Sequence, residues 1–133
     1  MKQITHNNEV VAIFHKLSEW KEGLDFITGD DAYIQAGTWN YNKNKVLKAH
    51  RHKINPRTVH QTQETFILLS GRLRVDLYDE NNNIFFQEEL GAGDIGIILN
   101  IGHGYFILDD NTKVLEVKPG PFTSVEEDKE MIQ

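Results

Sequence analysis

The sequence has no cysteine among its 133 residues, only three prolines, and no long hydrophobic run. Without cysteine there are no disulfides, thiolate nucleophiles, iron–sulfur clusters or cysteine-bound zinc, so a metal would need nitrogen and oxygen ligands. The longest apolar runs, such as 95–99, are far too short to span a bilayer. The N-terminus also lacks the cationic start and long apolar block of a secretory signal. These absences predict a cytoplasmic protein with no membrane partner.

The charge is negative overall and unevenly distributed. Fourteen basic and twenty acidic residues give a formal charge of −6, which disfavours nucleic acid as a partner. Between residues 40 and 57, however, there are six cations and no acid. The length predicts one domain over residues 1–122, with an N-terminal arm over 1–31 and a polar tail over 123–133.

Many short segments have the composition of β-strands, and polar turns follow about every ten residues. The segment 72–79 alternates strictly between apolar and polar residues, which is typical of a half-buried antiparallel strand. No long helix is indicated, so the predicted class is an all-β sandwich or barrel. The predicted strands are 10–14, 24–28, 32–41, 46–52, 65–70, 72–79, 84–90, 94–99, 105–110 and 112–120.

Three histidines and a glutamate form a candidate metal site. His50 and His52 lie two apart on the predicted strand 46–52, so both side chains point to the same face. Glu64 begins the next predicted strand, and His103 lies between two later strands. Imidazole and carboxylate ligands suit one divalent ion of Mn, Fe, Co, Ni or Zn, in a site that keeps a position for water or substrate.

These residues resemble the motifs of the cupin family. Glu64 followed by Gly71 is similar to the second half of the first cupin motif, whose first half is a His-x-His pair, and GDIGIILNIGHGY at 93–105 resembles the second. The resemblance covers roughly residues 44–120 and implies a double-stranded β-helix, the cupin jelly-roll barrel. It also implies His50, His52, Glu64 and His103 as the metal ligands. The runs 62–79 and 115–122 further resemble small cupins linked to polysaccharide and sugar-nucleotide metabolism.

The spacing departs from the cupin pattern and leaves two registers open. Eleven residues separate His52 from Glu64, where the family has three or four. His60 has the usual gap to Glu64, but its partner two positions earlier is Thr58. We favour the pair His50 and His52, because a longer loop costs little closure entropy whereas a lost ligand weakens the site.

The cations near the predicted ligands have two interpretations. Arg57 and Lys48 could bind the carboxylate or phosphate of a substrate, and Tyr105 could line the pocket and stack on a ring. Alternatively, the lysines protect an edge strand against mispairing.

The favoured function is a divalent-metal-dependent enzyme acting on a small anionic or sugar-type substrate, as an isomerase or epimerase. Glu64 or His60 would shuttle a proton. The alternatives are a non-catalytic ligand-binding or metal-binding module and an iron-dependent dioxygenase. The family resemblance also implies a homodimer, with residues 1–14 available for strand exchange.

Overall fold

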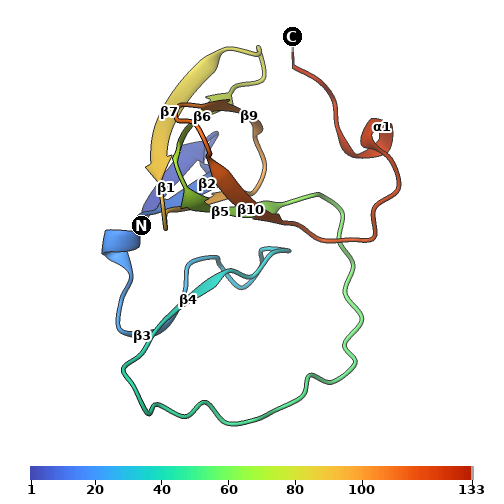
Figure 1. Ribbon diagram of the computed structural model, residues 1–133. Coiled ribbons are helices and arrows are strands. Elements are labelled where there is room, and N and C mark those ends of the chain that lie inside the picture. The colour runs from blue at the N-terminus through green and yellow to red at the C-terminus, as the bar shows by residue number, and fades with distance from the viewer. Residues whose placement is uncertain (133) are drawn as a thin grey trace.

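The computed structural model describes residues 1–132 and consists mainly of antiparallel strands (Figure 1). One sheet has five strands in the order β1-β2-β8-β5-β10, a second has three in the order β7-β6-β9, and β3 and β4 form a separate ribbon. The predicted all-β class is therefore confirmed. The strands are β1 (Lys2–His6), β2 (Glu9–His15), β3 (Gly23–Phe26), β4 (Gly37–Asn40), β5 (Glu64–Ser70), β6 (Arg72–Tyr78), β7 (Ile84–Gly91), β8 (Ile95–Ile98), β9 (Gly102–Ile107) and β10 (Lys113–Val117).

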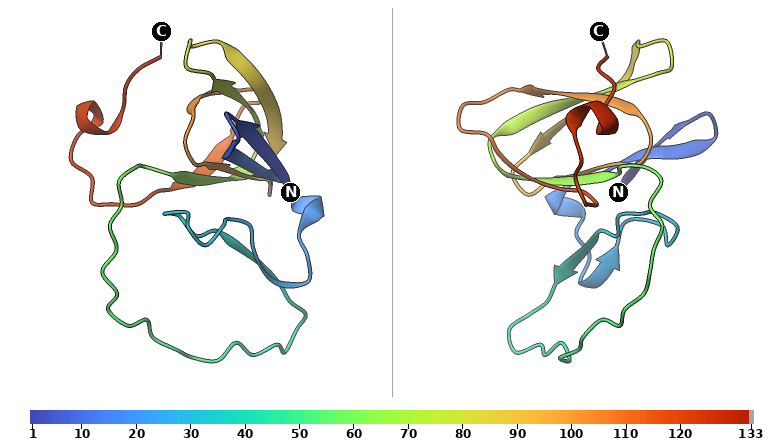
Figure 2. Two further views of the ribbon diagram at one scale, coloured as in Figure 1. Left: turned by 180° about the vertical axis from the view of Figure 1, so that it is seen from behind. Right: turned by 90° about the vertical axis from the view of Figure 1, so that its right-hand side faces the viewer.

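The main core lies between the five-stranded and three-stranded sheets, which face each other in Figure 2. The apolar face predicted for 72–79 is present in β6, where Leu73, Val75 and Leu77 are buried, and Asp76 on the opposite face is buried as well. From the facing sheet, β5 contributes Phe66 and Leu68. Since apolar side chains of both sheets leave water together, this contact is the main source of hydrophobic stabilisation.

A second apolar cluster covers the other face of the five-stranded sheet. Ile13, Ile95 and Ile97 pack there against Ile27, which follows β3. The ribbon of β3 and β4 therefore closes this face of the sheet, as Figure 1 shows below β5 and β10. The short 3-10 helix η1 (Leu17–Glu19) connects the sheet to the ribbon.

The turns follow the predicted chemistry. Asn82 has a positive φ of 62° in the turn between β6 and β7, where the side chain of Asp79 accepts hydrogen bonds from two backbone amides. Asn44 has a φ of 72°, a conformation that asparagine tolerates. Gly71, between β5 and β6, has a φ of 77°, and an added Cβ would lie 2.2 Å from the hydroxyl of Thr112. Only glycine fits this turn without rearrangement.

Residues 41–63 contain no strand, so the predicted strand over 46–52 is wrong, and so is its interpretation as a protected edge strand. Most of the segment runs as a wide arc away from both sheets (Figures 1 and 2), and its last residues return to them, so that Gln63 is buried and accepts hydrogen bonds from two backbone amides. Val46 is 78% exposed and Ile54 is 98% exposed. A β-prone composition produces a strand only where a neighbouring strand accepts its hydrogen bonds and buries one face, and this cationic segment has neither.

Other boundaries also differ from the predictions. The predicted strand 32–41 is reduced to β4, and β1, which the sequence did not indicate, pairs with β2 along one edge of the five-stranded sheet. In the polar C-terminal tail, residues 125–128 form the single-turn helix α1 (Val125–Asp128). None of the helices described between residues 1 and 132 has the length and apolar character needed to cross a membrane.

Candidate functional site

Glu64 and His103 form an ion pair at one end of the space between the two main sheets, in which Glu64 is buried and His103 is half-buried. Glu64 begins β5 and shares the inward face with Phe66 and Leu68. His103 lies on β9 opposite Leu77 of β6, so it also faces inward. The His103 Nε2 atom lies 2.9 Å from the Glu64 Oε1 atom. Strand register therefore brings together two residues that are 39 positions apart.

The surroundings of the pair fix its orientation. The His103 Nδ1 atom lies 3.0 Å from the carbonyl oxygen of Ile101, so Nδ1–H donates to this carbonyl and Nε2 faces Glu64. The hydroxyl of Tyr105 donates a hydrogen bond of 2.5 Å to the Glu64 Oε1 atom. The Tyr105 ring in turn packs edge-on against Phe66, with centroids 5.1 Å apart.

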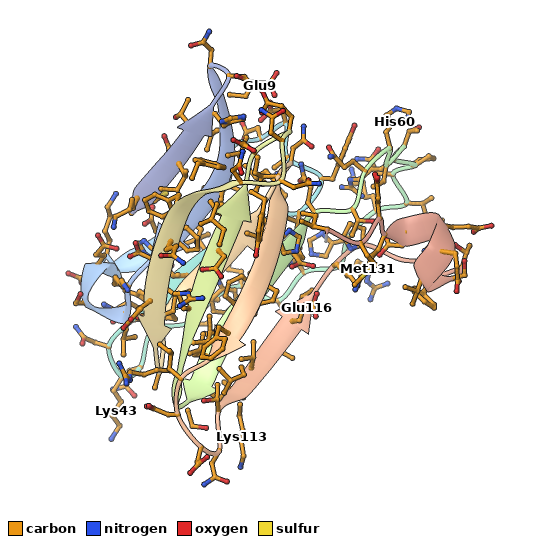
Figure 3. The ribbon with its side chains drawn as sticks, turned by 90° about the horizontal axis from the view of Figure 1, so that it is seen from above. Glu9, Lys43, His60, Lys113, Glu116 and Met131 are labelled. Carbon is orange, nitrogen blue, oxygen red and sulfur yellow. The ribbon has the colours of Figure 1, made fainter. Side chains whose placement is uncertain are left out.

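Glu116 adds a second carboxyl group to the site. It lies opposite Phe66 in the pairing of β10 with β5, so its side chain shares the inner face with Glu64. A hydrogen bond to Glu64 raises the pKa of Glu116, and burial raises this pKa further. Figure 3 shows Glu116 among the strands of the sandwich. The two carboxyl groups are therefore expected to share a proton, because two close carboxylates repel each other.

Contacts shift the pKa values of the pair in opposite directions. Burial alone would raise the pKa of Glu64, but hydrogen bonds from His103, Glu116 and Tyr105 outweigh it and lower this pKa to about 2. Burial alone would lower the pKa of His103, but the hydrogen bond and charge of Glu64 raise it. Burial and the hydrogen bond to Glu64 raise the pKa of Tyr105. The Glu64 carboxyl group is therefore ionised near neutral pH, and the shifts favour the protonated imidazole of His103 and the neutral phenol of Tyr105.

The ion pair forms part of the wall of a cavity of about 510 Å³, a size suited to a small molecule. Apolar atoms come mainly from Ile98, Ile101 and the C-terminal segment, and polar atoms come from the ion pair and its neighbours. The lining residues are Thr62, Glu64, Tyr78, Ile98, Ile101, Gly102, His103, Gly104, Tyr105, Asp128, Lys129, Glu130, Met131 and Ile132.

The structure thus brings together three of the predicted site residues, Glu64, His103 and Tyr105. The other predicted ligands, His50 and His52, lie in the exposed arc of residues 41–63, with ring centroids 5.1 Å apart. Within residues 1–132, no three His, Asp or Glu side chains are grouped closely enough to hold a metal ion. In this arrangement the predicted metal has two of its four ligands, which is too few for a complete site.

The remaining predicted residues also lie in the arc and do not line the cavity. The His60 ring packs edge-on near Tyr33, with centroids 6.3 Å apart, and Arg57 donates to the carbonyl oxygen of Asn55. Lys48 accepts a hydrogen bond at its carbonyl oxygen from the imidazole of His50. Neither of the two competing registers, His50 with His52 or Thr58 with His60, places its histidines at Glu64.

Sequence reasoning missed Glu116 and Asp128. The alternation of 112–118 could have indicated Glu116. Once β10 pairs with β5, the alternating side chains place Glu116 on the inward face. No signal pointed to Asp128, which reaches the cavity only because the C-terminal segment turns back over it.

No protein-family model, curated protein or solved structure matches this chain. The arrangement of its own residues therefore carries the functional argument.

Proposed function

We propose that the protein binds a small anionic or sugar-type molecule in the cavity at Glu64 and acts on it by proton transfer, in a reaction of isomerase or epimerase type. The observation that supports this most is the ion pair of the buried Glu64 and the half-buried His103 on the cavity wall. Buried charged pairs with opposed pKa shifts, open to a cavity, are typical of catalytic sites.

The pKa shifts assign roles in this proposal. The pKa of His103 is raised and the residue lines the cavity, so we assign it as the general acid for a substrate oxygen that comes within reach of Nε2, beside Glu64. Glu64 is a weak base because its pKa is about 2, and its anion holds the imidazolium in place. Glu116, whose pKa is raised by its hydrogen bond to Glu64, would exchange a proton with Glu64 rather than with the ligand, because it does not line the cavity. Tyr105 orients Glu64 through its hydroxyl.

The proposal extends to the fold, which we assign to the cupin jelly roll. Its support is the strand order, in which β5 and β6, β7 and β8, β8 and β9, and β9 and β10 each cross between the two facing sheets. Such alternation is expected of a jelly roll built from two Greek keys. The sequence resemblance to small cupins of polysaccharide and sugar-nucleotide metabolism supports sugar derivatives as the first ligands to test.

A divalent-metal form of the same site is a second candidate. It is favoured by His103, whose Nδ1 is held by a backbone carbonyl, as is usual for metal-binding histidines, while its Nε2 lies beside Glu64, the other predicted ligand at the cavity. Binding would require the arc of residues 41–63 to bring His50 and His52 to the cavity. The metal would then act as a Lewis acid on a substrate oxygen.

Solvent exchange tests the acid–base proposal. Purified protein is incubated in D₂O with a panel of sugar phosphates and nucleotide-linked sugars, and deuterium next to the carbonyl carbon is measured by mass spectrometry. Since general acid–base groups contribute about 10²–10⁴-fold, His103→Gln should reduce exchange by at least about 100-fold. The matched variant His60→Gln should keep full exchange, because His60 lies outside the cavity.

Full exchange in His103→Gln would contradict the assignment of His103 as the acid. Thermal stabilisation by a ligand without any exchange would instead identify the non-catalytic binding module. Elemental analysis of the wild type, His52→Ala and His60→Ala decides the metal form. Metal that is lost in His52→Ala and retained in His60→Ala would establish the register with His50 and His52.

A further inference from the structure

The C-terminal segment of residues 124–132 forms one side of the cavity at Glu64. Five consecutive residues, 128–132, line the cavity together with the ion pair. Figure 3 shows Met131 between α1 and the strands, and the right-hand view of Figure 2 shows α1 in front of the sandwich. The segment therefore lies across the open end of the sandwich, where a ligand would have to enter.

Asp128 holds this segment in place by two contacts. Its carboxylate accepts a hydrogen bond from the hydroxyl of Thr62, two positions before the catalytic candidate Glu64. It also forms an ion pair with Lys118, whose Nζ atom lies 3.9 Å away. Hydrogen bonds that involve a charged group are stronger than neutral ones, so Asp128 is the main polar anchor of the segment.

The far end of the segment has an apolar contact. Ile132 lies against Gly102 at the start of β9, where an added Cβ would be 2.7 Å from the Ile132 Cδ1 atom. This contact depends on the absence of a side chain at Gly102. Asp128 and Ile132 thus hold the two ends of the run of residues that lines the cavity.

The rest of the segment is weakly attached. Helix α1 has a single turn and no buried residue, and its cap is one hydrogen bond of 3.2 Å from the Glu127 amide to the Ser124 hydroxyl. Segments with few buried apolar contacts open at low free-energy cost. A short anchored segment of this kind can leave the cavity without disturbing the strands that hold Glu64 and His103.

We propose that residues 124–132 are a lid that controls access to the cavity, with Asp128 as its latch. The lid regulates the site of the proposed function, and its existence can be tested without any substrate. Opening breaks the contacts of Asp128 with Thr62 and Lys118 and exposes His103. Closing shields the imidazole, whose side chain is 28% exposed with the lid in place.

Chemical modification of His103 measures the opening directly. The full-length protein is treated with diethylpyrocarbonate, and the modification rate of each histidine is followed by peptide mass spectrometry. Asp128→Ala should raise the His103 rate about tenfold, the effect expected from losing a hydrogen bond to a charged group. Glu126→Ala removes the same charge from the same helix but lines no part of the cavity, so it should leave the rate unchanged. His50 and His52 provide internal references, because both are exposed.

A lid locked by a disulfide gives the opposite test, and it keeps the proposal falsifiable if Asp128→Ala fails to fold. The chain has no cysteine, so Thr62→Cys combined with Asp128→Cys introduces the only possible pair. Oxidation should lower the His103 rate below that of the wild type, and reduction followed by desalting should raise it above the wild-type rate, because the reduced variant has neither the disulfide nor the Asp128 latch. Equal His103 rates in the wild type, Asp128→Ala and the oxidised double variant would overturn the lid. Because no ligand is used, this result is independent of whether a substrate is ever found.

Discussion

The predicted ligands fall into two pairs with very different structural support. Glu64 and His103 lie on β5 and β9, whose hydrogen-bonded partners determine where each side chain points. His50 and His52 lie in the arc of residues 41–63, where no neighbouring strand determines their direction. The first pair meets at 2.9 Å, whereas the second stays outside the cavity. Pairing with a neighbouring strand, rather than spacing in the sequence, positions a functional side chain.

The same contrast holds for packing. The strands at Glu64 are fixed by close contacts such as the one between Gly96 of β8 and the ring of Phe66, whereas residues 46 and 54 of the arc are largely exposed. Substitutions in the sandwich and in the arc should therefore differ widely in their effect on the free energy of unfolding. Three experiments measure that difference.

The largest effect is expected at Gly96. An added Cβ would lie 2.1 Å from the Phe66 Cζ atom, so the ring would have to leave its place beside Tyr105 and Glu64. Gly96→Ala should lower the free energy of unfolding by about 3 kcal/mol, the upper range for overpacked cores. Urea denaturation measures this value. Gly91→Ala is the control, since its nearest contact would be an ordinary 3.9 Å. Equal stability of the two variants would mean that the strands at Glu64 are not tightly packed.

A smaller and pH-dependent effect is expected at the ion pair. Contact with Glu64 raises the pKa of His103, so its contribution to stability is fully present below pH 6.5 and is lost as the pH rises through the folded-state pKa. The lowered pKa of Glu64 contributes stability above pH 4.5, which is lost as the pH falls toward 2. The contribution of the pair should therefore be largest between these two values.

His103→Gln tests this window. Near pH 5.5 it should destabilise the protein by about 1–3 kcal/mol, because Glu64 is left buried with a weaker partner. The difference from the wild type should shrink as the pH rises to 9. His52→Gln, in the exposed arc, should change the stability by less than about 0.5 kcal/mol at every pH. Thermal unfolding at several pH values measures the stability of both variants and of the wild type. A stability difference between His103→Gln and the wild type that stays constant with pH would rule out the ion pair.

The sequence was sufficient to predict the features that depend on local pattern. The alternation of 72–79 predicted β6 and its buried face, and the asparagines at 81–83 predicted the turn that follows. Together with the apolar run of β5, they placed Glu64 at a strand start facing the core. These features depend on the alternation of side chains along a strand and on the backbone preferences of single residues. Both can be recognised from residues that are close together in the sequence.

The sequence was insufficient where the result depends on distant partners. The segment 46–52 has a β-like composition, but its strand would need an edge that accepts it, and no local pattern contains that information. Glu116 joins Glu64 through the pairing of β10 with β5, and Asp128 reaches the cavity because the chain reverses after β10. Contacts between distant parts of the chain decide all three features: the missing strand at 46–52 and the places of Glu116 and Asp128.

The smallest effect is expected in the arc itself, and it gives the strictest test of the comparison. Ile54 is 98% exposed, so Ile54→Ser should change the free energy of unfolding by less than about 0.5 kcal/mol. Urea denaturation measures this change. Ile97→Ser, which replaces a fully buried residue of the second core cluster, is measured in parallel and gives the loss of stability expected at a buried position. A loss above about 1 kcal/mol for Ile54→Ser would show that the arc packs against the sandwich in solution, because an exposed side chain cannot contribute that much. The outer edge of β9, the strand that carries His103, has no neighbour among the described strands and is open to such a segment. Packing there would bring His50 and His52 toward His103, and the metal form would then become the stronger of the two candidate functions.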